Sequence, residues 1–376
     1  MSQRAVDILE NVMSNPFICY DSEKQCEYPS SLCSLNRVII DKVPVKGIDD
    51  SIEGMRANDI FSAKVISDDI RRTAKAMHVD VSHYTHRELP RLISDGIMSD
   101  DVMLRRLATT IASKYGNRLG LILLTLKTGL EENRLARPEW DSRHWEYWAN
   151  IKNVMLTGGL ASGLMGKRFK EQIHYVFDMA GVKPYNISLY ENSSHIGALG
   201  CARLIKESDK TFAVLDLGQT NIKRCIVKKR GGELSHMITL ETMPSMNMEL
   251  DYSDSEENFN RALELHRYIL NVVCDTCKHM SDIGASYDEI IISIANYVVG
   301  GTLNPKRGGY AKLCLLSADY AEMLSEEISS RMRRAVRVKL VHDGAAIALN
   351  FSGHEDTVCV SLGTAFGVGF PCLKIE

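Results

Sequence analysis

The stretch FAVLDLGQTNIK, residues 212–223, decides the expected fold because it joins a buried-strand pattern to a turn. Residues 212–217 are almost all apolar, which is typical of a central strand. A second strand pattern covers residues 223–228, and the Gly and Thr between the two patterns favour a tight hairpin turn. We therefore expect a β-hairpin whose first strand is central in a sheet.

The turn of this hairpin is suited to binding phosphate. Gly218 lets the backbone approach a ligand closely, and Thr220 adds a hydroxyl donor beside the backbone N–H groups. Asp216, near the end of the first strand, is placed to hold Mg²⁺ through water. The residues expected to contact phosphate are Gly218, Gln219, Thr220 and Asn221.

Strand and helix patterns alternate after this hairpin, as they do in α/β proteins. The expected elements are strands at 289–295 and 335–341 with a helix at 318–332 between them, and a strand at 357–362. Asp343 follows the strand at 335–341 and opens a helix. Gly363 and Thr364 follow the last strand and form a second Gly-Thr turn.

The chain before residue 206 has its own α/β pattern. Its expected elements are an amphipathic helix at 100–126, a strand and turn at 153–161, a helix at 167–180, a strand at 186–190 and a small-residue helix at 194–202. The turn of the first strand contains Gly158 and Gly159. Each motif occurs once, so the two halves are not repeats of one another.

Together these motifs resemble the actin-like kinases and, within them, the ROK family of sugar kinases. The first phosphate motif of that family is similar to residues 212–223, the second to 363–369, and the adenosine motif to 153–161. The helix that ends the family's chain resembles residues 194–202. The resemblance covers about residues 85 to 370 and implies an α/β, two-lobed actin-like ATPase (ribonuclease-H-like) fold.

The motifs stand in a different order from that of the family, which predicts a circular permutation. Residues 1–205 correspond to the family's C-terminal lobe and residues 206–356 to its N-terminal lobe, with 357–376 returning to the C-terminal lobe's sheet. The new join is the charged segment 206–210. Domain termini often lie close together, so such a rearrangement preserves a fold. Two truncated domains in tandem are the alternative.

The resemblance also implies roles for site residues. Asp343 corresponds to the base that accepts the proton of the sugar hydroxyl. Gly218, Thr220, Gly363 and Thr364 correspond to groups that bind the β- and γ-phosphates of ATP, and Gly158 and Gly159 to the adenosine turn. From the residues alone, an N-cap of the helix is the more common role for an Asp at the position of Asp343, and Gly158-Gly159 could be a plain strand-to-helix turn.

The acceptor pocket departs from the family pattern. Gln219 replaces the second Gly of the first motif, and His342 replaces an Asn beside the base. Asn296 lies in a segment that replaces a Gly- and Pro-rich loop. We expect His342 and Asn296 to contact the substrate, and we expect that substrate to differ from ordinary glucose.

Composition sets the broad class. The 376 residues are enough for two lobes, and 45% hydrophobic with 25% charged residues is ordinary for a soluble enzyme. A net charge of -3 gives no reason to expect nucleic acid or an anionic membrane as a partner. Apolar runs stay short of the ~18 residues of a membrane span, and Met1 begins no signal peptide.

Ten scattered cysteines suit free thiols in a reducing cytoplasm. Cys274 and Cys277 have the CxxC spacing but fall in a helical pattern, which favours a helix-face pair over a metal site. Cys19, Cys26 and Cys33 are evenly spaced, and they leave zinc binding open as the weaker alternative.

We expect an ATP- and Mg²⁺-dependent kinase of a sugar or sugar derivative. A sugar-sensing regulator without catalysis and an ATPase without a sugar acceptor are the alternatives. The sequence leaves the sugar undefined, and it leaves a monomer and a homodimer both open.

Overall fold

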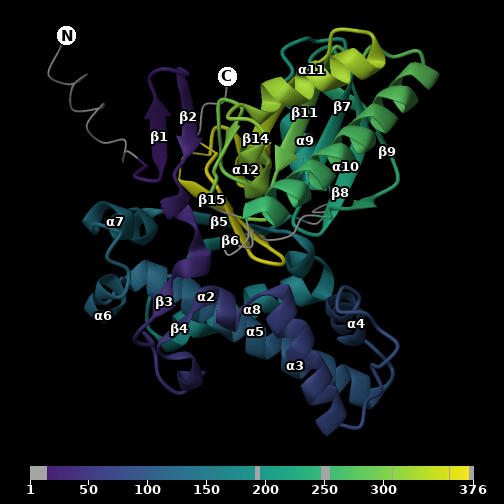
Figure 1. Cartoon of the computed structure of the whole chain (residues 1–376). Coiled ribbons are helices and arrows are strands. Elements are labelled where there is room, and N and C mark those ends of the chain that lie inside the picture. Colours follow the sequence, from purple (N-terminus) through teal and green to yellow (C-terminus); the bar gives the residue numbers. More distant parts are fainter. Residues whose placement is uncertain (1–14, 191–194, 247–254, 307, 355, 372–376) are drawn as a thin grey trace, which may run out of the picture. The chain divides into compact units, whose positions relative to one another are not determined.

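The computed structural model of the chain describes residues 15–190, 195–246, 255–306, 308–354 and 356–371. The chain divides into two compact units (Figure 1). Unit 1 is drawn from Met1–Cys19, Ser30–Ser193 and Asp356–Gly367. Unit 2 is drawn from Tyr20–Pro29, Ser194–Glu355 and Val368–Glu376.

Unit 2 is built on a mixed sheet in which β7 is central. Its strands are β7 (Thr211–Leu217), β8 (Asn221–Arg230), β9 (Glu233–Thr239), β10 (Met243–Pro244), β11 (Glu289–Ile294) and β14 (Arg337–His342). The order is β9-β8-β7-β11-β14, with the short β10 also paired to β8. β8 is antiparallel to β7 and β9, whereas β7, β11 and β14 are parallel.

The strand order β9-β8-β7-β11-β14 can be compared with known folds once its strands are renumbered along the chain. It becomes 3-2-1-4-5 with only the second strand antiparallel, which is the ribonuclease-H-like order of actin-like ATPases. The predicted fold class is therefore confirmed. The predicted hairpin is also confirmed, because β7 pairs with β8 from Thr211–Lys228 to Leu217–Ile222.

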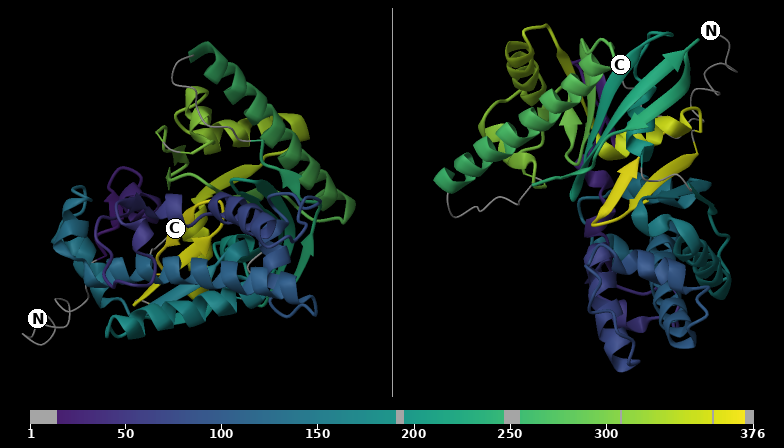
Figure 2. Two further views of the ribbon diagram at one scale, coloured as in Figure 1. Left: turned by 90° about the horizontal axis from the view of Figure 1, so that it is seen from below. Right: turned by 90° about the vertical axis from the view of Figure 1, so that its right-hand side faces the viewer.

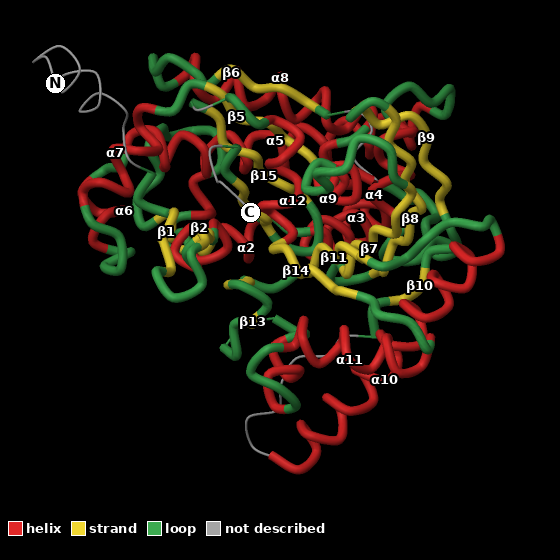
Figure 3. Tube along the Cα trace, turned by 90° about the horizontal axis from the view of Figure 1, so that it is seen from above, coloured by secondary structure: helices red, strands yellow, loops and turns green. Residues whose placement is uncertain are grey.

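The two faces of this sheet carry different helices, as Figure 3 shows. On one face, alternate residues of β7 join an apolar core with α10 (Ser255–Asp282) and α11 (Tyr320–Met332). On the other face, α9 (Ile196–Ala202) contacts β7 and β11, and α12 (Asp343–Ala348) contacts β11 and β14. Asp216 is on this second face, since a Cβ on Gly197 of α9 would lie 3.4 Å from its carboxyl group.

The small residues of α9 and α12 explain why α9 belongs to unit 2. A Cβ on Gly200 would overlap the Ala346 carbonyl, so only glycine permits this approach of the two helices. Asn350 Nδ2 donates to Ile196 O at 2.8 Å and closes the contact. The main segment of unit 2 thus includes α9, and the predicted lobe boundary at residue 205 stays a prediction.

A hairpin near the start of the chain also contributes to unit 2. β1 (Ile18–Asp21) and β2 (Cys26–Pro29) pair, and residues 20–29 are assigned to unit 2. Lys24 Nζ donates to Val299 O at 2.8 Å and to Thr302 Oγ1 at 2.5 Å. These bonds fasten the hairpin to the turn between β12 (Val298–Val299) and β13 (Thr302–Leu303).

Unit 1 contains a second, smaller sheet of order β16-β15-β5-β6. Its strands are β5 (Asn153–Thr157), β6 (Asn186–Leu189), β15 (Thr357–Leu362) and β16 (Phe366–Gly369), the last of which ends in unit 2. β15, β5 and β6 are parallel. The two strands in the interior of this order therefore come from distant parts of the chain.

Two long helices lie side by side in unit 1 (Figure 2). α5 (Val102–Thr128) approaches α8 (Gly163–Met179) through glycines, since a Cβ on Gly116 or Gly120 would crowd Gln172 or Val176. Asp101 caps α5, and Gly129 ends it with φ 51°. The other elements are α2 (Ala57–Ile60), α3 (Ala63–Ala76), α4 (Leu89–Gly96), α6 (Glu131–Leu135), α7 (Ser142–Asn150), β3 (Ile39–Ile40) and β4 (Met55–Arg56).

Within the described part of the chain, every helix is too short or too polar to cross a membrane.

Candidate functional site

The carboxyl ends of β7, β11 and β14 bring polar side chains together in unit 2. Asp216 is paired in register with Ser293, and Ile294 with His342, so these residues lie at one edge of the sheet. Ser293 Oγ donates to Asp216 Oδ1 at 3.0 Å. Asp343 follows His342 directly as the first residue of α12. The edge therefore gathers the predicted metal residue, the predicted base and a serine that the sequence analysis missed.

Asp343 is not the N-cap of α12. That position belongs to His342, whose Nδ1 accepts the Ala345 N–H at 3.2 Å. Asp343 Oδ1 accepts the N–H of Gly344 at 2.7 Å, and the side chain is 34% exposed. Burial raises the pKa of Asp343 to about 6. A carboxylate of that pKa is suited to accept a proton near neutral pH.

Asp216 is half-buried near the end of β7. Burial raises the pKa of Asp216 above its ordinary value. Lys223 opposes the rise, and the negative charge of Asp343 adds to it. Burial and Lys223 both lower the pKa of His195, which is near the same carboxylate and contacts Cys225. A divalent cation would relieve the repulsion between the two carboxylates.

The turn between β7 and β8 is held by its carbonyl groups. Tyr310 Oη donates to Gly218 O at 2.9 Å, Ser245 Oγ to Gln219 O at 2.8 Å, and Ser245 N–H to Thr220 O at 3.1 Å. In a planar trans peptide the N–H points opposite to the C=O. The N–H groups that follow these carbonyls, those of Gln219, Thr220 and Asn221, therefore point away from the donors.

Among the glycines of the three predicted turns, Gly158 alone has a left-handed backbone conformation. Gly158 has φ 90°, and a Cβ there would overlap the Leu362 carbonyl at the end of β15. Gly218, Gly159 and Gly363 have ordinary φ values. A Cβ on Gly159 would meet nothing within 4 Å, and one on Gly363 only the Ala365 carbonyl at 4.0 Å.

Unit 1 brings its own two predicted turns together. Thr157 of β5 pairs in register with Ser361 of β15, so Gly158-Gly159 and Gly363-Thr364 follow adjacent parallel strands. Ala63 N–H donates to Gly363 O at 2.9 Å. The adenosine-type turn and the second phosphate-type turn thus share one edge of this sheet.

Asn296 and Gln219 hold loops of unit 2. Asn296 is buried, and its amide accepts the Asn304 N–H at 2.9 Å and donates to the Asn304 carbonyl at 3.2 Å. Gln219 Nε2 donates to Ala295 O at 3.4 Å. These bonds give Asn296 a structural role, and its contact with substrate stays a prediction.

A groove of about 670 Å³ runs along β14 in unit 2 and reaches His342. Acidic and basic side chains both line it, among them Lys24, Glu27, Glu322, Arg337 and Lys339. Such a mixture suits a polar molecule better than a strongly charged or an apolar one.

Several residues that shape the site were missed by the sequence analysis. Ser293 interrupts an apolar strand, and a buried hydroxyl there signals a polar partner. Tyr297 stacks on His342 with ring centroids 4.7 Å apart. Tyr310 and Ser245 hold the phosphate-type turn from positions remote in sequence. Only Ser293 gave a local signal.

Clusters of three or more metal-ligating side chains are absent from the described residues. Cys274 and Cys277 are buried on α10 as free thiols, as expected for a helix-face pair. In the part of the chain that the structure describes, Cys19, Cys26 and Cys33 also form no disulfide. Mg²⁺ is commonly bound by one or two carboxylates together with substrate phosphates, so Asp216 fits that ion without a larger cluster.

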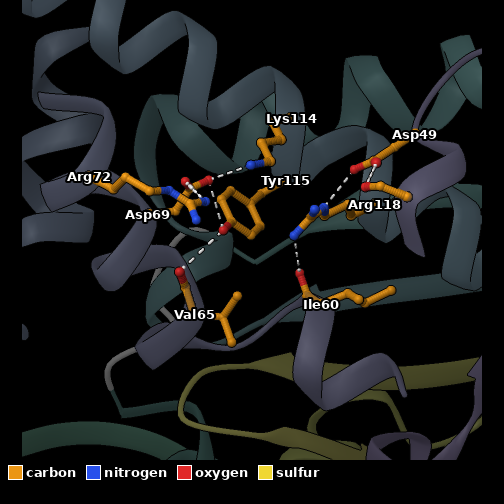
Figure 4. A network of polar contacts seen from close by, with 9 residues as sticks. Asp49, Ile60, Val65, Asp69, Arg72, Lys114, Tyr115 and Arg118 are labelled. Atoms are coloured by element: carbon orange, nitrogen blue, oxygen red, sulfur yellow. Dashed lines mark hydrogen bonds and ion pairs between the residues drawn. The ribbon is translucent and has the colours of Figure 1, made fainter. Parts of the chain in front are cut away.

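A different polar network lies in unit 1 (Figure 4). Asp69 of α3 is 4% exposed and contacts Arg72, Lys114 Nζ at 2.7 Å and Tyr115 Oη at 3.1 Å. Arg118 of α5 pairs with Asp49 at 2.7 Å and donates to the Ile60 carbonyl. Each acid here has cationic partners, so the network ties α3 and the 49–60 segment to α5.

Comparison with known proteins gives little. No family model and no curated protein matches the chain. A solved Ppx/GppA family member from Aquifex aeolicus is similar at 14% identity over 37% of this chain and 40% of its own, with a TM-score of 0.22. The PPX-GPPA enzyme of Aquifex aeolicus is similar at 13% identity over 38% of this chain and 41% of its own, with a TM-score of 0.22. The type II variant of the Aquifex aeolicus Ppx/GppA phosphatase is similar at 13% identity over 51% of this chain and 51% of its own, with a TM-score of 0.19.

The matched regions thus span about half or less of those proteins. At these TM-scores the similarities carry no argument. Strand order carries the fold assignment.

Proposed function

We propose that this protein is an ATP-dependent kinase that phosphorylates a hydroxyl group of a sugar or sugar derivative. The observation that carries the proposal is Asp343. It follows β14, the parallel strand at one edge of the sheet; His342 and not Asp343 caps α12, and burial raises the pKa of Asp343 to about 6. The resemblance to the ROK family favours a sugar acceptor.

Phosphoryl transfer requires positioning and charge neutralisation. The acceptor oxygen forms a bond to the γ-phosphorus of ATP while the bond from that phosphorus to the β,γ-bridging oxygen breaks, so ADP leaves. Asp343 takes the hydroxyl proton in the same step. Mg²⁺, held by Asp216 through water, would neutralise phosphate charge. The amide groups of the Gln219–Asn221 turn would donate to phosphate oxygens, as would the Gly363-Thr364 turn.

The order of strands in unit 1 supports the further proposal of a circular permutation. β5 and β6 precede the sheet of unit 2 in the chain, whereas β15 and β16 follow it, and all four share one sheet. In the unpermuted order β15 and β16 would come first. α9, which packs on β7 and β11, corresponds to the helix that would end the chain.

The test is ADP release with ATP and Mg²⁺ over a panel of sugars and sugar derivatives. A kinase releases ADP only with an acceptor and yields a sugar phosphate. ADP release without any acceptor supports the ATPase alternative. Binding of a sugar without any turnover supports the regulator. Either of these two results overturns the kinase proposal.

Gly159→Val tests the adenosine turn. Because Gly159 has an ordinary φ and open space, the variant should keep the nucleotide-free melting temperature. ATP with Mg²⁺ at 100 times its Kd should stabilise the native chain by about 2.7 kcal/mol, and the valine should abolish this shift. Gly159→Ala is the matched control and should retain most of it. A full shift in the valine variant would exclude this turn as the adenosine site.

A further inference from the structure

Both ring nitrogens of His342 are engaged inside unit 2. Nδ1 accepts the backbone N–H of Ala345 at 3.2 Å, and Nε2 lies 3.3 Å from Asp343 Oδ1. The side chain is 7% exposed. The Tyr297 ring stacks on the imidazole at 4.7 Å with planes 14° apart, which fixes the orientation of the ring. The ring therefore has one defined hydrogen-bonding arrangement.

This arrangement selects one tautomer. Burial lowers the pKa of His342 to about 4, so the imidazole is neutral near pH 7 and carries a single proton. A nitrogen that accepts an N–H bond holds no proton, which excludes Nδ1. The proton is then on Nε2, the nitrogen that faces Asp343 Oδ1.

The consequence falls on the two oxygens of Asp343. Oδ1 accepts the N–H of Gly344 at 2.7 Å and faces the Nε2–H of His342. The hydrogen bond from Gly344 and the 3.3 Å contact with His342 Nε2 thus involve the same oxygen. Gly344 permits the approach of the ring, because a Cβ at that position would lie 2.8 Å from His342 Cε1. Oδ2 remains the oxygen that can receive a proton from an acceptor.

We propose that His342 is a positioning residue, whose neutral ring donates to Asp343 Oδ1 and thereby directs Oδ2 toward the acceptor hydroxyl. This inference rests on the proposed function, in which Asp343 is the base. It gives His342 a role different from the predicted contact with substrate, since neither ring nitrogen is left for a sugar. The stack on Tyr297 and the cap to Ala345 hold the donor in place.

Two substitutions separate this role from helix capping. His342→Asn keeps an oxygen near the position of Nδ1, so it retains the cap but loses the donor to Asp343. His342→Gln can place an N–H₂ near the position of Nε2, so it retains the donor but loses the cap. Neither variant has an imidazole, so ring titration is removed equally from both. Asp216, the charged group that couples to Asp343 from β7, is unchanged in both.

The first measurement is ¹⁵N NMR of the His342 ring in the full native chain, without nucleotide or acceptor. We expect the tautomer protonated at Nε2 at pH 7. A ring protonated at Nδ1, or at both nitrogens, overturns the proposal. This result does not depend on turnover, so it stands apart from the success or failure of the proposed function.

The second measurement is the ¹³C carboxyl titration of Asp343. A donor to the charged carboxylate lowers its pKa, so His342→Asn should titrate at higher pH than the native chain. His342→Gln should titrate close to the native chain. Equal titration of Asp343 in the native chain and in His342→Asn, with native folding, overturns the proposal.

The third measurement uses the acceptor identified in the ADP-release panel. A displaced base should lower kcat of His342→Asn by about 10- to 100-fold with little change in KM, and His342→Gln should recover much of the loss. A raised KM with unchanged kcat would instead make His342 a residue that binds the acceptor. Normal turnover of Asp343→Asn would overturn the proposed function, while the tautomer and titration results would stand.

Discussion

Asp69 and Asp343 are both part of helices, and burial acts to raise the pKa of both carboxyl groups, yet their surroundings differ. Burial alone would raise the pKa of Asp69, but the hydrogen bonds of Lys114, Arg72 and Tyr115 outweigh it and hold the pKa below its ordinary value. Among the described residues, no Lys or Arg pairs with Asp343, and burial leaves its pKa raised. The first environment stabilises a charge, whereas the second opposes it.

The difference shows what each unit uses its acids for. Asp69 and Asp49 join α3 and the 49–60 segment to α5, so their charges stabilise the packing of these elements. Asp216 and Asp343 raise the free energy of the folded state when both are ionised. Groups kept in an unfavourable state near one another are more typical of functional sites than of structural ones.

Asp343→Asn gives the largest expected effect. The amide cannot accept the proton of the hydroxyl, so turnover should fall by about 10² or more while ATP affinity and the fold are retained. Steady-state ADP release and the ATP-dependent melting shift report the two quantities. Asp69→Asn is the matched variant from the other region and should leave kcat unchanged under conditions where it is folded. Near-normal turnover of Asp343→Asn would exclude Asp343 as the base.

Asp69→Asn should lower the free energy of unfolding by about 2 kcal/mol at pH 7, because the buried Tyr115, the half-buried Lys114 and the exposed Arg72 lose a charged acceptor. The folded-state pKa of Asp69 is below that of an unfolded chain. Its stabilisation is therefore present above about pH 4 and is lost as the pH falls through the folded-state pKa. Urea unfolding at several pH values measures it. Asp68→Asn, on the same helix with an exposed Lys64 partner, should change little.

Asp343→Asn should have the opposite and smaller effect on stability. A raised folded-state pKa means that the native chain is favoured below about pH 4 and loses that advantage as the pH rises through about 6. The amide avoids this loss, so the variant should be more stable than the native chain at pH 7. Since the carboxyl is 34% exposed, solvent reduces the gain to about 1 kcal/mol or less. The measured quantity is the free energy of unfolding of the variant minus that of the native chain. A lower value of this difference at pH 7 than at pH 4 would contradict the comparison.

Local patterns predicted the elements that carry the site. The apolar run at 212–217 and the Gly-Thr turn after it predicted β7 and its hairpin, and the strand before Asp343 was predicted within a few residues. Side-chain alternation and turn composition act over a few residues, so a sequence displays them directly. The long helix expected at 100–126 is likewise observed at Val102–Thr128.

Contacts between remote residues could not be predicted in this way. Tyr310 and Gly218 are 92 positions apart, and nothing in either neighbourhood indicates that one holds the other. The Gly200–Ala346 contact decides the unit to which α9 belongs, and it is set by tertiary packing. His342 stands where the family has Asn, whereas the role proposed for it depends on tertiary contacts. Ala345 donates to its Nδ1, Asp343 lies beside its Nε2, and Tyr297 stacks on its ring.

The place of β15 in the sheet of unit 1 has a consequence for synthesis. β15 lies between β16 and β5, yet it begins at Thr357, after β5, β6 and the whole sheet of unit 2 have left the ribosome. Until then β5 presents an edge of unpaired N–H and C=O groups, which is a template for pairing with another chain. A nascent chain stalled before Thr357 should therefore aggregate through unit 1 even when unit 2 has folded, and a separate peptide carrying the β15 sequence should suppress that aggregation.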